Sequence, residues 1–156
     1  MASNNSGSIW TGITPSGGGG KGIKSDLSVQ GGDYVARCVD FFSFFNSDRR
    51  VWTCKFTFTI ETGDHEGKHL VRWADAGGGD TPEDERKKLE HLAQDFLLTM
   101  GSLPPFTPES GLEDLDGTKR AIVGAVCRVR VKTWVGRNGQ PGISVYLQDT
   151  IAHGGQ

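Results

Sequence analysis

The stretch AIVGAVCRVRVKTWVGRNGQPGISVYL, from Ala121 to Leu147, decides the fold. Apolar and polar side chains alternate on both sides of a glycine-rich segment, Gly136 to Gly142. Alternation with a period of two is typical of a strand with one packed and one exposed face, and turn residues between two such runs indicate a hairpin. The sequence therefore predicts two long strands, over residues 123–134 and 143–147, joined by a turn.

The exposed face of this hairpin carries cations and aromatic rings, and no acidic residue lies between Gly117 and Gln148. Such a face suits a single-stranded nucleic acid, because cations follow the phosphates and rings stack on the bases. The alternative is a solvated strand whose long cations keep the sheet soluble. The residues predicted to contact a nucleic acid here are Arg128, Arg130, Lys132, Trp134 and Tyr146, with Arg137 in the turn closing over the strand.

Composition divides the chain into a tail and one domain. Residues 1–31 are rich in Gly, Ser and Asn, so they bury too little apolar surface to offset the entropy of ordering, and we expect a flexible tail. The domain is expected over residues 32–150, with a short C-terminal tail over 151–156. No apolar run reaches the length of a membrane span and no signal peptide is evident, so we expect a cytoplasmic protein without a membrane partner.

The distribution of charge and the spacing of the cysteines each carry information about the protein. Net charge is −2, but Asp75 to Asp116 holds 11 acidic and 3 basic residues, and the remainder holds 8 acidic and 14 basic residues. This polarity suits a phosphate-binding face with an acidic opposite end. The three cysteines form no Cys-x-x-Cys pair, so we expect them to be reduced and buried.

Three further strands are predicted in the first half of the chain, over residues 34–42, 51–60 and 69–73. The run FFSFFNSDRR, Phe41 to Arg50, interrupts the alternation and predicts a loop. Its rings would stack bases and its arginines would hold phosphates. Alternatively, Phe41 to Phe45 form a subunit interface, and the chain is a protein-interaction or structural module that oligomerises. The predicted contact residues are Phe44, Phe45, Arg49 and Arg50, together with Lys55 on the half-exposed Thr and Lys face of the second strand.

An amphipathic helix follows the third strand. Thr81 is a good N-cap, Pro82 suits the first helical position, and Gly101 ends the helix. Its apolar residues recur at helical spacing, so it is expected to plug the open end of a small barrel. A short helical turn is predicted over residues 109–117.

Two apparent motifs are not expected to form catalytic or binding sites, although a zinc hydrolase at His65 and His69 is a third hypothesis that metal analysis would test. His65 to His69 matches H-E-x-x-H, but zinc binding by this motif requires a helix, and here a glycine lies inside it and strands flank it. Gly17 to Ser25 resembles a phosphate loop, but Ile23 occupies the place of the required lysine. We therefore expect no metal site, no cofactor and no enzymatic activity.

The element order is strand, strand, strand, helix, strand, strand. This is the plan of the OB-fold, a five-stranded, partly open Greek-key barrel with one helix between strands 3 and 4. Four segments of the sequence also match a known family: Gly32-Asp33-Tyr34-Val35-Ala36, the strand from Trp52 to Gly63, Gly67-Lys68-His69-Leu70, and Leu112-x-x-Leu115-x-Gly117.

On these features, residues 32–150 resemble a phage- and prophage-encoded family of unknown function that is similar to phage single-stranded DNA-binding proteins. The resemblance implies a mainly β OB-fold protein that coats single strands without sequence specificity in phage-type replication or recombination, inside a bacterial or phage-infected cell. The expected partners are single-stranded DNA, a second copy of the chain, and replication or recombination proteins. The chain does not end in the acidic tail that many such proteins use for recruitment.

Strand register decides which rings are exposed. A shift of one residue would exchange the two faces, so that Trp52 and Trp73 would stack bases and Trp134 would lie in the core. We favour Trp134 because its neighbours on the same face are cations.

Overall fold

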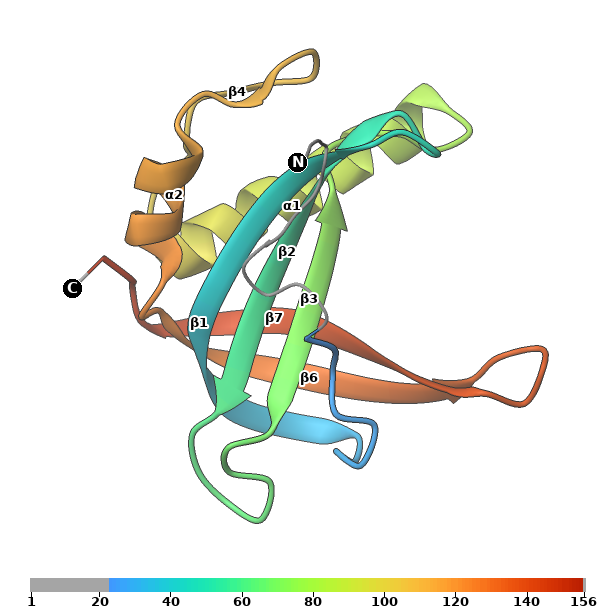
Figure 1. The fold of residues 1–156 in the computed structure, drawn as a ribbon, viewed down its shortest axis with the longest axis vertical. Helices are drawn as coiled ribbons and strands as arrows, with labels where there is room; N and C mark the ends of the chain where they lie inside the picture. The colour runs from blue at the N-terminus through green and yellow to red at the C-terminus, as the bar shows by residue number, and fades with distance from the viewer. Residues whose placement is uncertain (1–22, 156) are drawn as a thin grey trace, which may run out of the picture.

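The structure is a computed structural model that describes residues 23–155. Its main feature is a five-stranded antiparallel sheet of order β3-β2-β1-β6-β7, accompanied by a short two-stranded sheet and two helices (Figure 1). Residues 1–22 of the predicted tail lie outside the described residues. The elements are β1 (Gly32–Asn46), β2 (Val51–Ile60), β3 (His69–Asp75), α1 (Pro82–Met100), β4 (Phe106–Thr107), β5 (Gly111–Leu112), α2 (Leu115–Ile122), β6 (Val126–Val135) and β7 (Pro141–Ala152).

Strand β1 joins the two parts of the sheet. Residues 32–37 pair with β6, and residues 36–46 pair with β2, with a β-bulge between Cys38 and Asp40. Because a bulge bends a strand, β1 turns from the direction of β6 and β7 into that of β2 and β3, which cross them in Figure 1.

The bulge also corrects the prediction of a phenylalanine-rich loop, because β1 continues to Asn46. After the bulge, Phe41 and Ser43 point inward and are buried, whereas Phe42 is exposed on the outer face. The alternation is shifted by one residue rather than lost, and in the sequence that shift looks like the end of the strand.

Strands β3 and β7 are the two edges of the sheet and form no ladder with each other in the described part of the chain. They nevertheless lie side by side, because Arg72 Nη1 of β3 donates a hydrogen bond of 3.2 Å to the carbonyl oxygen of Val145 in β7. The prediction of a mainly β chain with a helix between the third and fourth long strands is confirmed. The sheet is not closed by strand pairing, and we call the line where β3 meets β7 the seam.

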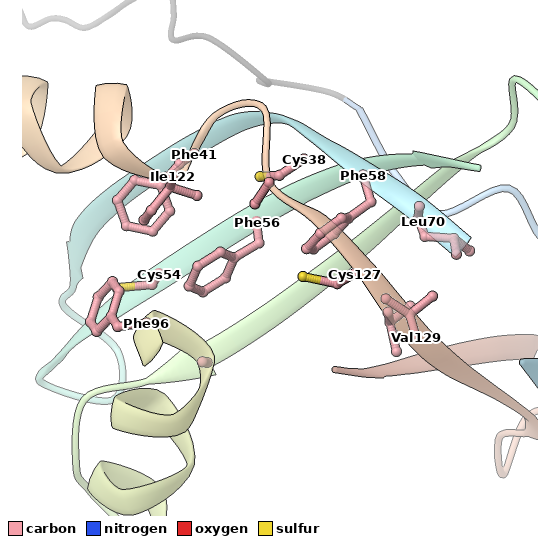
Figure 2. Close-up of a cluster of buried hydrophobic side chains, with 14 of the residues drawn as sticks. Cys38, Phe41, Cys54, Phe56, Phe58, Leu70, Phe96, Ile122, Cys127 and Val129 are labelled. Atoms are coloured by element: carbon pink, nitrogen blue, oxygen red, sulfur yellow. The ribbon is translucent and has the colours of Figure 1, made fainter. Parts of the chain in front are cut away.

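The inner face of the sheet is packed against α1. Phe96 of α1 lies with its ring 6.1 Å from that of Phe41 and 6.0 Å from that of Phe56, and Figure 2 shows these side chains converging from the helix and the strands. The three cysteines are free and buried, as predicted. Burial raises the pKa of each thiol, Cys38, Cys54 and Cys127, to about 12, so they behave as small apolar side chains.

Helix α1 has the ends that the sequence predicts. The Thr81 side chain accepts a hydrogen bond of 3.1 Å from the backbone N–H of Asp84, and Pro82 is the first helical residue. Gly101 follows the helix with a φ of 79°, a left-handed conformation that glycine adopts without strain. The capped ends fix α1 over the inner face of the sheet.

The connection into the basic hairpin differs from the prediction. Asp114 accepts a hydrogen bond from the Gly117 N–H and starts α2, which runs to Ile122 and so extends past the predicted helical turn, which ends at Gly117. Gly124, with a φ of 99°, then turns the chain into β6. The helical turn predicted over 109–117 is therefore placed too early in the sequence.

The folded part of the chain begins before Gly32. Val29 is in the core, the Ser25 hydroxyl accepts a hydrogen bond of 2.7 Å from the Val71 N–H, and the Asp26 N–H donates one of 2.9 Å to the His69 carbonyl. Residues 24–29 therefore lie along β3, and we call them the N-terminal strap. At the other end, β7 continues to Ala152, into the predicted C-terminal tail.

Candidate nucleic-acid interface

A row of aromatic side chains from β1 and β3 crosses the outer face of the sheet. Phe42 and Phe44 are stacked with ring centroids 6.1 Å apart, and Phe44 meets Trp73 edge-on at 6.3 Å. Trp73 is 53% exposed. The row arises because these residues follow the bulge in β1 or alternate outward in β3, so that all three rings stand on one side of the sheet.

The outer face of β6 and β7 carries a second set of rings, as the alternation in the sequence predicts. Trp134 is 52% exposed, covers Gly142 on the neighbouring strand, and donates a hydrogen bond of 3.0 Å from Nε1 to Ser144 Oγ. Lys132 Nζ lies 5.5 Å from the centre of the Tyr146 ring. Backbone pairing and the Ser144 hydrogen bond hold the Trp134 ring in place while leaving half of it exposed.

The two sets of rings meet at the seam. A hollow of about 350 Å³ is bordered by Trp73 from β3 and Trp134 from β6, with Leu27 of the N-terminal strap and Ile143 of β7 on its walls. A smaller hollow of about 140 Å³ lies between Trp73 and Tyr146. Trp73 borders both, so the seam is a broken groove with exposed rings along its length.

Arg72 lies at the centre of the seam. Besides its bond to Val145, its guanidinium carbon is 5.6 Å from the centre of the Tyr146 ring, and its Nε is 3.1 Å from Oδ2 of the buried Asp95 in α1. Desolvation raises the pKa of Asp95, and the charge and hydrogen bond of Arg72 partly counteract that rise. This arginine therefore links α1, β3 and β7 beneath the rings.

Two of the predicted phosphate contacts are already paired with carboxylates. Arg130 Nε lies 2.9 Å from Asp33 Oδ1 across the β1–β6 pair, and Arg128 Nε lies 3.6 Å from Asp149 Oδ2. The hydrogen bond from Arg130 lowers the pKa of Asp33, and the same bond raises the pKa of Arg130. Asp149 belongs to β7 of the hairpin itself and Asp33 to the neighbouring β1, so a phosphate must compete for these arginines.

The prediction that Lys55 lies on a half-exposed face is wrong. Lys55 is only 7% exposed, and Thr53 and Thr57 on the same face are each 1% exposed. Phe42 and Trp73 are its direct cross-strand neighbours, and its Nζ lies 5.2 Å from the centre of the Trp73 ring. Desolvation lowers the pKa of Lys55. Large side chains on the adjacent strands cover this lysine, which supports Trp73 from below rather than reaching a phosphate.

The predicted residues from the first loop are separated. Phe44 belongs to the outer row, but Phe45 points to the other side of β1, where it is 47% exposed and packs edge-on against Trp52 at 5.7 Å. Phe41 is in the core. An oligomer interface would therefore draw on Phe42 and Phe44 or on Phe45, but not on the whole cluster from Phe41 to Phe45.

The remaining predicted cations lie in turns. Arg49 and Arg50 are exposed between β1 and β2, and Arg50 has a φ of 58° in that turn. Arg49 forms two hydrogen bonds to Asp75, of 3.1 and 2.9 Å. Arg137 is exposed in the β6–β7 turn, which projects beyond β3 in Figure 1.

Trp73 is the main residue of the site that the sequence analysis predicted to be exposed only under a shifted strand register. It was expected to be exposed if the register shifted and Trp134 moved inward, but both rings are exposed in the same register. Alternation alone gave no clear signal, since Trp73 shares its face of β3 with Val71, which is 5% exposed. Its position relative to Trp134 depends on β3 meeting β7, which no local pattern indicates.

Residues 65–68 of the H-E-x-x-H sequence lie in the turn between β2 and β3, and His69 begins β3, so the helix that a zinc site needs is not formed there. Lys68 Nζ lies 3.1 Å from His65 Nδ1, and Thr59 Oγ1 lies 3.3 Å from His69 Nδ1. Within residues 23–155, no group of three or more His, Cys, Asp or Glu side chains is arranged to hold a metal ion.

Neither helix in the described part of the chain is long and apolar enough to cross a membrane. Comparison with known proteins finds no family model that matches this chain and no curated protein with significant similarity to it.

Proposed function

We propose that this chain is a non-enzymatic, non-sequence-specific single-stranded DNA-binding protein with an OB-fold, acting in phage-type DNA replication or recombination in the bacterial cytoplasm. The observation that carries the proposal is the pair of half-exposed indoles, Trp73 and Trp134, on one hollow at the seam. Stacking on exposed rings contributes about 1–3 kcal/mol per base and accepts any base.

The strand arrangement supports the OB-fold part of the proposal. Five antiparallel strands in the order β3-β2-β1-β6-β7, with β3 lying beside β7, match a five-stranded Greek-key barrel that is partly open at one seam. The helix between β3 and β6 covers the inner face, as that plan requires. Nucleic acids bind this type of barrel across its outer face and in its loops.

The chemistry of the groove supports a strand rather than a duplex. The hollow is lined mainly by apolar side chains, with Lys24 and Ser25 as its polar members, and the Trp134 N–H is already bonded to Ser144. Few groups are available to read base edges, whereas flat rings are available to unstacked bases. The proposed stacking residues are Trp73, Trp134, Tyr146 and Phe44, and the proposed phosphate contacts are Lys132, Arg128, Arg130, Arg49, Arg50 and Arg137.

A titration of intrinsic tryptophan fluorescence tests the proposal. Oligothymidine of about 30 bases is added at salt concentrations from about 50 to 200 mM. Saturable quenching that weakens with salt is expected, because stacking quenches the indoles and phosphate contacts release counterions. Absence of both quenching and a mobility shift at low salt would overturn single-strand binding. The same titration with duplex DNA serves as the control and should show weaker quenching.

A further inference from the structure

Helix α1 was expected to plug the open end of a barrel, and it lies in the acidic section of the chain that was expected opposite the phosphate-binding face. Its residues Lys88 and His91 nevertheless border a hollow beside Trp73. A third hollow, of about 270 Å³, lies where Trp73 meets α1. It is lined by cations from three separate elements: Arg49 from the β1–β2 turn, Arg72 from β3 and Lys88 from α1. His91, one turn along α1 from Lys88, also lines it.

The charges around this hollow do not cancel. Arg72 is paired with Asp95, at 3.1 Å. Arg49 and Lys88 share one carboxylate, Asp75, with closest approaches of 2.9 and 4.0 Å. Among the residues that line the hollow, these two cations face one carboxylate and leave a surplus of one positive charge, which matches the single negative charge of a phosphodiester. Asp48, whose charge also raises the pKa of Arg49, lies outside this lining.

Asp75 also fixes the position of Arg49. Burial alone would raise the pKa of Asp75, but hydrogen bonds from Arg49 and from Thr53, the latter of 2.8 Å, outweigh burial and lower it. The carboxylate is thus ionised at neutral pH and holds the Arg49 guanidinium at the rim of the hollow. This arrangement leaves Lys88, at 4.0 Å, as the more loosely held cation.

We propose that this hollow binds one backbone phosphate of the single strand, with Lys88, His91 and Arg49 as its ligands. The inference rests on the proposed function and extends it to α1. Trp73 lines this hollow as well as the two hollows of the seam. A nucleotide whose base stacks on Trp73 therefore has its phosphate beside Lys88 and His91, and the strand leaves the groove across α1.

The salt dependence of binding tests this subsite, since each phosphate contact contributes about 0.7 to the slope of log K against log salt for a single strand. Lys88→Ala should lower that slope by about 0.7 and weaken binding several-fold at low salt, with wild-type affinity approached at high salt. Lys87→Ala is the matched control, because Lys87 is an exposed neighbour on α1 that does not line the hollow. His91→Gln, a second variant, should weaken binding without changing the melting temperature.

The outcomes separate the subsite from the proposed function. Trp134→Ala should weaken binding by the same factor at every salt concentration, because stacking releases no counterions. Suppose that Trp134→Ala weakens binding while Lys88→Ala and His91→Gln behave as Lys87→Ala does. The proposed phosphate subsite would then be wrong, whereas the proposal that the groove binds a single strand would be supported. If the wild-type chain does not bind oligothymidine, both proposals are wrong.

Discussion

Trp134 and Gly142 act as one unit at the level of single residues. The indole covers Gly142, and a Cβ added to that glycine would overlap the ring. Trp134→Ala should weaken oligothymidine binding by about 1–3 kcal/mol, equally for all sequences. Gly142→Ala should weaken binding too, although the indole is retained, because the ring must leave its position beside Ser144.

Fluorescence anisotropy of a labelled strand measures both effects. Trp134→Phe is the control, since it keeps a ring over Gly142 and should restore most of the affinity. Wild-type affinity in Trp134→Ala would show that the β6–β7 face does not stack bases.

The pair of Asp33 and Arg130 sets a limit on phosphate binding. The hydrogen bond from Arg130 holds the pKa of Asp33 below its usual value, so this carboxylate is ionised at neutral pH and stays ionised in mild acid. Asp33→Asn should release Arg130, tighten binding at low salt and steepen the salt dependence by about 0.7 in slope.

Asp116→Asn provides the matched control for net charge, because Asp116 is an exposed acid on α2, outside the β6–β7 face. The quantity that tests this prediction is the slope of log K against log salt, measured by anisotropy titration. Equal slopes for Asp33→Asn and Asp116→Asn would mean that Arg130 does not contact a phosphate.

Among the secondary-structure elements, Arg72 and Asp95 join α1 to β3 and β7. Both side chains are largely buried, with exposed fractions of 16% and 5%. Removing one partner leaves an uncompensated buried charge, which typically costs about 3–5 kcal/mol. Arg72→Met should therefore lower the free energy of unfolding by about that amount, measured by chemical denaturation.

The double variant Arg72→Met with Asp95→Leu should recover part of the loss, because two apolar side chains leave no unpaired charge. The pKa of Asp95 gives the sign of the pH effect. Burial raises the pKa of Asp95, and in Arg72→Met the opposing charge is gone. The contribution of Asp95 to the stability of this variant should therefore be greatest in acid and fall as pH rises through the folded-state pKa of Asp95. A variant with the same pH dependence as wild type would contradict this role for the pair.

Elements with a regular period were predictable from the sequence, and those set by a local irregularity were not. β2, β6 and α1 follow their periods and caps, so their positions were found within a few residues. β1 was predicted too short because the bulge after Cys38 shifts its alternation. The helical turn that became α2 was predicted too early, over residues 109–117, because the residue that caps the helix is Asp114.

The candidate site was predictable only in part, for a related reason. Alternation shows which face a residue occupies, so Trp134 and Tyr146 were placed correctly on the exposed face. Pairing with strands outside the hairpin decides the other neighbours, so Asp33 beside Arg130 and the rings over Lys55 could not be anticipated, whereas Asp149 beside Arg128 comes shortly after the predicted strand. The meeting of Trp73 with Trp134 depends on the bend in β1, which no local pattern encodes.

In the molecule as a whole, the contacts that join β3 to β7 and the residues of the proposed binding site lie along the same line, the seam. Arg72 crosses it beneath the rings, Trp73 and Trp134 border it on the outside, and α1 covers it from within. The same line that strand pairing leaves open is therefore where exposed rings and surplus cations gather.

The N-terminal strap has a consequence for self-association. Ser25 and Asp26 occupy backbone groups of β3 that would otherwise present a bare strand edge, and bare edges recruit strands from neighbouring molecules. A chain that starts at Gly31 should aggregate or form concentration-dependent oligomers in light scattering. A chain that starts at Lys24, which keeps the strap, should behave as the full-length protein does, and so the strap would protect the monomer from edge-to-edge aggregation.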